Sequence, residues 1–434
     1  MRVLSALATV FTVTPSSSSS NANANANANA NANTTREAAD RYLTQFQRQP
    51  VAWTVADRLL STASHATNVD HFNGVVDSTQ VHFFAAQTLH VKCRADILQL
   101  TMTTTVNSNT KECGGVSGND DHLMSLRTSL MKHLLFFIDQ EGKKAIVTRL
   151  AMALCALSVQ MNWDSVVDDL LLNLQQSQQS QVGGSGGTNT QSQIHLVLEI
   201  AKLLPEEATS DRLLMQDESQ RILFCQNLQQ TSSKIAAFLH YCVVSLPNGG
   251  NANGNANAEN NKIKELVLKC LHSWVSNVNI PPQLLQETQL LDWIFTLLQA
   301  GDVHGGETFE LAVDVIIEIL RCYPSNNAHH TGLVHRLIPL VMALGTGEAS
   351  VFQKMIREED EDGMRAYCRI FTEMGESYMS LIMHHEDLNQ VALVDLVLAC
   401  SAIPDNGEYI VIDDADDDDD DGIELIVQVY VYDI

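Results

Sequence analysis

Basic residues are scarce in this chain. Its 434 residues include 26 Lys and Arg against 52 Asp and Glu, which gives a formal net charge of −26. Proteins that bind nucleic acid neutralise its phosphates with clustered Lys and Arg, so this balance argues against a direct nucleic-acid partner. It favours basic protein partners reached by electrostatic steering, although an acidic charge also keeps a protein soluble without any partner.

Long apolar runs and paired cysteines are also missing. No uninterrupted apolar run reaches the roughly 18–20 residues that a membrane-spanning helix needs, so we expect no membrane insertion. The nine cysteines are scattered singly with no CxxC motif, which favours free thiols in a reducing compartment over a disulfide framework. The apolar stretch Val3–Val13 fits either a short secretory signal or a first helix of the fold, and the cysteine pattern favours the helix.

Motifs that would carry chemistry are few and incomplete. The cluster of His329, His330 and His335 has no acidic or thiol ligand at the spacing of a zinc site. The segment Ser129–Lys132 matches SxxK, but the companion motifs of that enzyme class are absent. We therefore expect no enzyme, no catalytic residue, no metal site and no cofactor.

Helical periodicity, in contrast, is abundant. In Val81–Cys93 the apolar residues Val81, Phe84, Ala85 and Leu89 fall at i, i+3, i+4 and i+8, which is one stripe of a helix. Neither a lone helix nor a lone pair buries such a stripe well, so these helices must stack on neighbours. Two helices and a turn make a unit of about 40 residues, the spacing of HEAT repeats, and we expect about eight to ten of them.

The same period continues along the chain. Lys143–Met161 places Ile146 and Leu150 on one face, and the pattern Ile194–Leu204 is expected to end at Pro205. Polar low-complexity inserts interrupt these patterns, and such compositions cannot bury apolar area, so we expect disordered loops there. The inserts span Ser16–Asn33, Thr103–Asp120, Gln175–Gln193 and Asn248–Asn261.

Six segments in the same order resemble transportin-SR, and with it the karyopherin-β family of nuclear import receptors. The resemblance is colinear from about Ala39 to Tyr409. The matching segments are Tyr42–Leu60, Val81–Lys92, Ile146–Trp163, Val197–Ala208, Lys269–Val275 and Tyr367–Ile382.

This resemblance implies a fold and a set of partners. It implies an all-α fold, a right-handed superhelical α-solenoid of HEAT-like repeats with disordered low-complexity loops. Family members bind the small GTPase Ran in its GTP form through inner helices, contact phenylalanine-glycine nucleoporins, and release cargo such as arginine-serine-rich proteins when Ran-GTP binds. It also implies shuttling between the nucleus and the cytoplasm.

The resemblance carries over to helices, and helical phase then selects residues. On Val81–Cys93 the Ran-facing candidates are Gln87 and Lys92, because both are polar and point away from the apolar stripe. On the next inner helix, Lys143–Met161, the candidates are Thr148 and Arg149.

The resemblance also divides the chain into five segments. Family members are roughly twice this length, which points to a truncated chain or a natural short form. The segments are a first repeat helix in 1–15, a disordered Ser/Asn-Ala insert in 16–35, importin-β-like amino-terminal HEAT repeats that form the Ran-binding half in 36–250, further exportin/importin-like HEAT repeats in 251–402, and a divergent acidic tail in 403–434.

The tail departs from the family pattern. It contains an acidic run, which is either a solvated loop or a flexible patch for a basic partner, and a strand-like end at Leu425–Ile434. The run comprises Asp413, Asp414, Asp416, Asp417, Asp418, Asp419, Asp420 and Asp421.

Three other functions stay open at this point. An exportin-like karyopherin would bind cargo more tightly with Ran-GTP, whereas an import receptor would release it. A HEAT-repeat scaffold would share the fold without any Ran function. A secreted or enzymatic protein is the third alternative.

Overall fold

The computed structural model describes residues 2–11, 22–65, 77–102, 118–180, 190–215, 217–245, 254–300, 307–347, 349–384 and Leu396. Every regular element in these ranges is a helix. None of the helices in them is long and apolar enough to cross a membrane. The acidic run and the strand-like segment Leu425–Ile434 lie outside the described residues.

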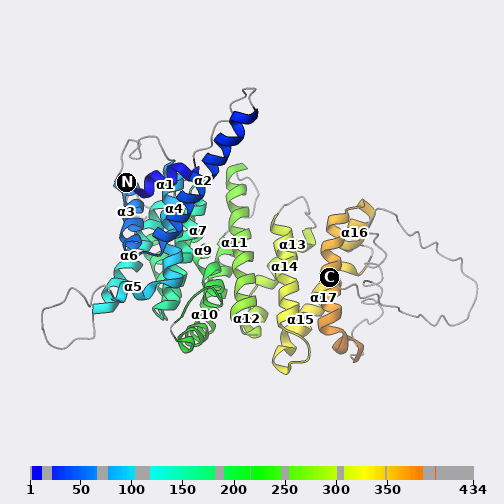
Figure 1. Ribbon diagram of the computed structural model, residues 1–434. Helices are drawn as coiled ribbons and strands as arrows, with labels where there is room; N and C mark the ends of the chain where they lie inside the picture. Colours follow the sequence, from blue (N-terminus) through cyan, green and yellow to red (C-terminus); the bar gives the residue numbers. More distant parts are fainter. Residues whose placement is uncertain are drawn as a thin grey trace, which may run out of the picture.

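Within the described ranges the helices follow one another without an intervening sheet (Figure 1). Their bounds are α1 Arg2–Phe11, α2 Ala22–Gln47, α3 Val51–His65, α4 Ser78–Ala95, α5 Ile97–Met102, α6 Gly118–Ile138, α7 Lys144–Gln160, α8 Val166–Ser180, α9 Thr190–Ala208, α10 Glu218–Ser245, α11 Gly254–Val278, α12 Pro282–Glu287, α13 Leu290–Ala300, α14 Glu307–Cys322, the 3-10 helix Ala328–His330, α15 Thr331–Gly345, α16 Val351–Glu358 and α17 Glu361–His384. This all-α architecture confirms the fold class predicted from the periodicity.

Antiparallel pairing organises the helices into two rows. The second helices of successive pairs pack against one another in the order α4, α7, α9, α11, α14 and α17, and we call this the B row. The first helices form an A row of α3, α6, α8, α10, α12 with α13, and α15 with α16. Figure 1 shows α11, α14 and α17 standing side by side along the elongated molecule.

Together with α1 and α2, the described residues contain seven such pairs, fewer than the expected eight to ten. Part of this difference comes from two repeats in which two short helices take the place of one first helix, so that more helices make fewer pairs. Pro281 precedes α12 and Pro282 is its first residue, and Thr288 and Gln289 separate α12 from α13. Helices α15 and α16 divide another first helix in the same way.

Helices extend further into the low-complexity inserts than expected. Helix α2 begins at Ala22, so the expectation of disorder throughout 16–35 is wrong for residues 22–35. Alanine at every second position is the best helix former, and no Gly or Pro separates this stretch from the amphipathic half of the helix. The stretch projects beyond the neighbouring helices in Figure 1. Helices α9 and α11 likewise begin at Thr190 and Gly254, inside their inserts.

Pro205 does not end α9, which continues to Ala208. A proline in a helix cannot donate to the carbonyl four residues earlier, here that of Ala201. The buried indole of Trp274 on α11 supplies the missing donor, with its Nε1 2.8 Å from that oxygen. The contact with the next B-row helix therefore satisfies the backbone group that the proline leaves open.

Candidate partner-binding surface on the B row

The four candidate residues fall on two B-row helices that pack together. Gln87 and Lys92 lie on α4, and Thr148 and Arg149 lie on α7. Gln87, Thr148 and Arg149 are partly exposed. The Gln87 Oε1 atom is buried without a hydrogen-bond partner in the described part of the chain.

Lys92 does not face a partner, and this expectation is wrong. Its side chain is fully buried, with Nζ 2.9 Å from Asp96 Oδ2 and 2.7 Å from Gln99 Oε1. The same ammonium lies 5.5 Å from the ring centre of Trp53. Lys92 is three residues beyond Leu89, which places it on the apolar stripe and not opposite to it. Correct counting along the helix would have shown this from the sequence.

Thr148 connects α7 with the next B-row helix. Its hydroxyl donates to Glu199 Oε1 of α9 at 2.9 Å, and Lys202 Nζ lies 2.9 Å from the other oxygen of that carboxylate. Both oxygens of Glu199 are therefore engaged within the protein. Thr148 has a structural partner, although it stays partly exposed.

Arg149 makes only weak contacts within the described residues. Its Cζ lies 5.9 Å from the ring centre of Phe83 on α4, and its Nη1 lies 3.6 Å from the sulfur of Met152. No described carboxylate approaches it within ion-pair distance. Arg149 is thus the candidate whose charge is most available to another molecule.

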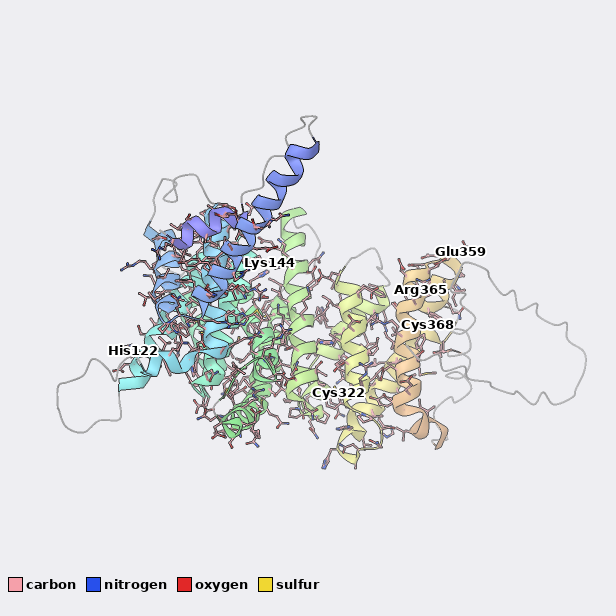
Figure 2. The ribbon with its side chains drawn as sticks, in the orientation of Figure 1. His122, Lys144, Cys322, Glu359, Arg365 and Cys368 are labelled. Atoms are coloured by element: carbon pink, nitrogen blue, oxygen red, sulfur yellow. The ribbon has the colours of Figure 1, made fainter. Side chains whose placement is uncertain are left out.

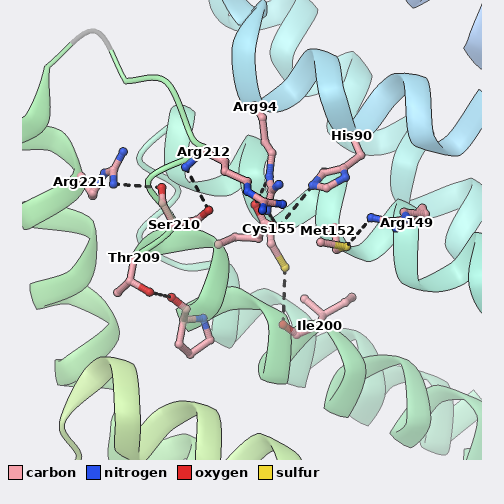
Figure 3. Close-up of polar contacts among 12 residues, drawn as sticks. His90, Arg94, Arg149, Met152, Cys155, Ile200, Thr209, Ser210, Arg212 and Arg221 are labelled. Carbon is pink, nitrogen blue, oxygen red and sulfur yellow. Dashed lines mark hydrogen bonds and ion pairs between the residues drawn. The ribbon is translucent and has the colours of Figure 1, made fainter. Parts of the chain in front are cut away.

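A buried charged cluster lies beside these residues and was not expected from the sequence. Arg94 Nε of α4 donates to Glu207 Oε2 of α9 at 2.8 Å, and a second guanidinium nitrogen contacts Oε1. His90 Nε2 lies 3.4 Å from Oε1, without hydrogen-bond geometry. Figure 3 shows Arg94 and His90 pointing toward the same place above α9, beside Cys155.

The electrostatics of this cluster follow from burial and charge. Burial raises the pKa of the Glu207 carboxyl, but interactions with His90 and Arg94 outweigh it and hold the pKa below its ordinary value. Burial lowers the pKa of His90, and the nearby carboxylate offsets this in part. Arg94 and Glu207 are 113 residues apart, so no local signal in the sequence could have paired them.

The cluster also anchors the backbone that follows α9. The Leu214 amide donates to the Arg94 carbonyl at 2.9 Å, and Gln160 Nε2 donates to the Leu214 carbonyl at the same distance. Arg221 of α10 donates to the carbonyls of Ser210 and Leu213. Three B-row helices, α4, α7 and α9, are therefore held at a fixed relative position.

Side chains of a Ser–His–Asp set do meet on the A row, but not as a proton relay. His133 Nε2 lies 3.0 Å from Asp57 Oδ1 and 3.2 Å from Ser129 Oγ, and Ser129 itself contacts that carboxylate. A relay needs the two different ring nitrogens of histidine, one for the acid and one for the nucleophile. This arrangement joins α3 to α6 and offers no activated hydroxyl.

The histidines near α15 have structural contacts. His330 Nδ1 lies 3.2 Å from the Pro324 carbonyl and its Nε2 lies 3.1 Å from Asn327. No group of three His, Cys, Asp or Glu residues in the described ranges has the geometry of a metal site.

Two family models match the chain. The model described as Exportin 1-like protein matches residues 143–316, from just before α7 into α14. The model of the second TPR domain of transportin-3 and importin-13 matches residues 359–411.

Curated relatives match over most of the chain. The mRNA transport regulator MTR10 of Saccharomyces cerevisiae is 25% identical over 374 residues, 84% of this chain and 32% of the relative. Importin-13 of Homo sapiens and Transportin MOS14 of Arabidopsis thaliana are each 24% identical over 383 residues, 86% of this chain and 32% of each relative. The chain spans about a third of the length of these relatives. With its HEAT-like rows, it belongs to the karyopherin-β family, where it corresponds to the amino-terminal portion of an importin-type member.

Proposed function

We propose that this chain acts as a nuclear transport receptor that binds Ran-GTP and carries protein cargo through the nuclear pore. Its relatives bear the names importin, transportin and mRNA transport regulator. The cargo class that fits the transportin-type resemblance is the arginine-serine-rich splicing factors. The receptor would shuttle between the cytoplasm and the nucleus.

One observation supports a partner surface on the B row more than any other. Arg149 and Gln87 are partly exposed polar residues on adjacent helices; in the described part of the protein Arg149 has no carboxylate partner, and Gln87 Oε1 has no hydrogen-bond partner. The Glu207 cluster joins α4 to α9, and the Thr148–Glu199 hydrogen bond joins α7 to α9. A rigid surface with unsatisfied polar groups loses little entropy on binding, which suits a protein partner such as Ran-GTP.

The A row supports contacts with phenylalanine-glycine nucleoporins. Large apolar side chains are exposed there, which is unusual for a surface that has no partner. They are Leu135 on α6, Leu172 on α8, and Ile222, Leu223, Tyr241 and Val244 on α10. Phenylalanine rings of a nucleoporin could pack between such side chains.

The acidic run would engage a basic partner. Its eight carboxylates, Asp413 to Asp421 without Ala415, provide a high density of negative charge. Arginine-rich cargo segments are the natural complement, because arginine pairs with carboxylates in a bidentate manner.

A pull-down with Ran tests the proposal directly. The chain should retain GTP-locked Ran and not GDP-loaded Ran, and Arg149→Ala should reduce the retained amount. The matched control is Lys132→Ala on the A-row helix α6, an exposed cation away from the surface. Equal retention of the two nucleotide forms would contradict the Ran-dependent function and leave a HEAT scaffold.

The match to the Exportin 1-like model favours export as a second candidate direction. The two directions differ in the sign of the coupling between Ran and cargo. Addition of Ran-GTP should weaken cargo binding for an import receptor and strengthen it for an export receptor. Cargo affinity measured with and without Ran-GTP distinguishes them.

A further inference from the structure

We propose that α7 carries a carboxylate-binding strip, formed by Lys144 and Arg149, that receives acidic side chains of a protein partner docked on the B row. The proposal rests on the proposed function only in that a partner docks on this row. It adds which chemical groups the partner must present and which residues bind them.

Arg149 differs from the other described arginines of the B row. Each of those has a carboxylate partner, at 2.8 Å for Arg94, 2.9 Å for Arg321, 3.8 Å for Arg365 and 2.6 Å for Arg369. Arg149 instead rests near an aromatic ring and a thioether. A guanidinium has five N–H donors, and the weak contact with sulfur satisfies at most one of them.

The position of Arg149 favours an ion pair with an incoming group. The residue is partly exposed, so water is partly displaced from its guanidinium before any partner arrives. The Phe83 ring and Met152 limit the directions that the side chain can take. A restrained, incompletely hydrated guanidinium loses less entropy on pairing with a planar carboxylate than a free surface side chain does.

Lys144 extends the strip toward α9. It is the first residue of α7, it is exposed (Figure 2), and within the described residues it makes no ion pair. Its charge is felt by His195 of α9, whose pKa is lowered first by burial and then by Lys262 and Lys144, against the opposing charges of Glu259 and Glu199. Since Glu199 is already bound to Thr148 and Lys202, it does not neutralise Lys144.

On the side of α7 that faces His90 of α4, the balance of charge is similar. Burial lowers the pKa of His90, and the charges of Arg94 and Arg149 lower it further, while Glu207 alone opposes them. Glu207 in turn is held by Arg94. Glu307 of α14 also feels the charge of Lys144, but it is paired with Lys269, so within the described residues neither Lys144 nor Arg149 has an ion-pair partner of its own.

The net negative charge of the whole chain determines which kind of anion can bind to the strip. With a net charge of −26, the protein repels the extended phosphate backbone of a nucleic acid. A few carboxylates on a folded partner feel mainly the nearest charges, because salt screens charges beyond about 10 Å. Acidic protein side chains are therefore the ligands that this strip fits.

The first test uses a fluorescent ten-residue aspartate peptide and the full chain at about 0.1 M ionic strength, where charges beyond about 10 Å are screened. We expect the wild type to bind, and Arg149→Glu or Lys144→Glu to weaken binding about tenfold or more, as loss of a charge-assisted hydrogen bond does. The affinity of Arg149→Lys for the peptide should fall between those of the wild type and Arg149→Glu, since lysine keeps the charge and loses the planar fork of N–H donors. The matched control, Lys132→Glu on α6, should stay within about twofold if charge on the A row has no role.

The acidic run of the chain itself could compete with the peptide. The same titration is therefore repeated with its eight aspartates changed to asparagine, which removes that competition. Absence of peptide binding in both forms overturns the proposal, and so does equal weakening by the control substitution. An unchanged thermal transition in each variant shows that the fold is retained.

A second probe separates this proposal from the Ran-dependent function. GTP-loaded Ran is titrated against wild type and Arg149→Glu. If the peptide result holds while Ran shows no preference for its GTP form, the strip stands and the Ran function fails. If Ran-GTP binds and Arg149→Glu binds it and the peptide as tightly as wild type, the strip is wrong and the Ran function stands.

Discussion

The two ends of the B row are joined by different chemistry. Among α4, α7 and α9, buried charges do the joining, with Glu207 contacted by Arg94 and His90. Among α13, α14 and α17, buried tyrosine hydroxyls donate to backbone carbonyls, from Tyr367 to Leu298 at 2.6 Å and from Tyr378 to Tyr323 at 3.0 Å.

Ion pairs in the second region lie nearer to solvent. Arg321 pairs with Glu373 at 2.9 Å, and these side chains are 61% and 12% exposed, whereas those of Arg94 and Glu207 are 16% and 2% exposed. A buried pair is costly to break, because the remaining charge stays desolvated, while an exposed pair is replaced by water. The geometry of the amino-terminal region thus depends on buried charge, whereas that of the carboxy-terminal region depends mainly on buried hydroxyl contacts.

Removal of the buried carboxylate should have the largest effect. Glu207→Leu leaves the Arg94 guanidinium desolvated and unpaired, and we expect a loss of about 3 kcal/mol in the local free energy of opening. Hydrogen exchange resolved along the chain measures it, because a solenoid does not unfold in one step. The loss should be confined to α4, α7 and α9.

Two further variants sharpen this result. Glu373→Leu breaks the exposed pair with Arg321 and should cost about 0.5 kcal/mol. The double variant Arg94→Met with Glu207→Leu should recover much of the loss, since an apolar pair can replace a buried ion pair. Similar losses for Glu207→Leu and Glu373→Leu would remove the distinction between the two regions.

A lower pH should also destabilise the two regions to different extents. Burial lowers the pKa of His82 to about 4, with a further contribution from Lys143, and burial also lowers the pKa of His90. Below the ordinary histidine value of 6.5 the unfolded chain takes up these protons and the folded chain does not, so the free energy of unfolding falls as the pH falls. The depressed pKa of Glu207 adds a loss below 4.5, when its stabilising charge is removed.

Hydrogen exchange at pH 7 and pH 5, corrected for intrinsic rates, tests this difference. Protection in α4 should decrease more than protection in α17, whose buried tyrosine hydroxyls do not titrate in this range. His82→Gln should reduce the acid sensitivity of α4. Equal losses in both helices would contradict the assignment.

The two regions also differ in how much of them the sequence reveals. The apolar period of α7 predicts its helix and its buried face, because α7 makes most of its contacts with α4, α6 and α9, in its own and the neighbouring repeats. Lys92 is buried because it follows Leu89 by three residues and so lies on the apolar side of α4. Arg94 and Glu207 are 113 residues apart, on two helices that lie on either side of α7. Their pairing therefore depends on the curvature of three stacked helices and not on any local pattern.

Tyrosine substitutions in the carboxy-terminal region should have a smaller effect than loss of the buried carboxylate. Tyr378→Phe removes one hydroxyl and leaves the Tyr323 carbonyl without that donor, and we expect a loss of about 1 kcal/mol in the local free energy of opening. Tyr241→Phe on α10 is the matched control, since that side chain is 45% exposed and water replaces its contacts. Because burial raises the pKa of Tyr378, its hydroxyl stays protonated and the loss should be the same at pH 5 and pH 7. A loss that grows toward pH 5 would mean that titrating groups join the helices of this region as well.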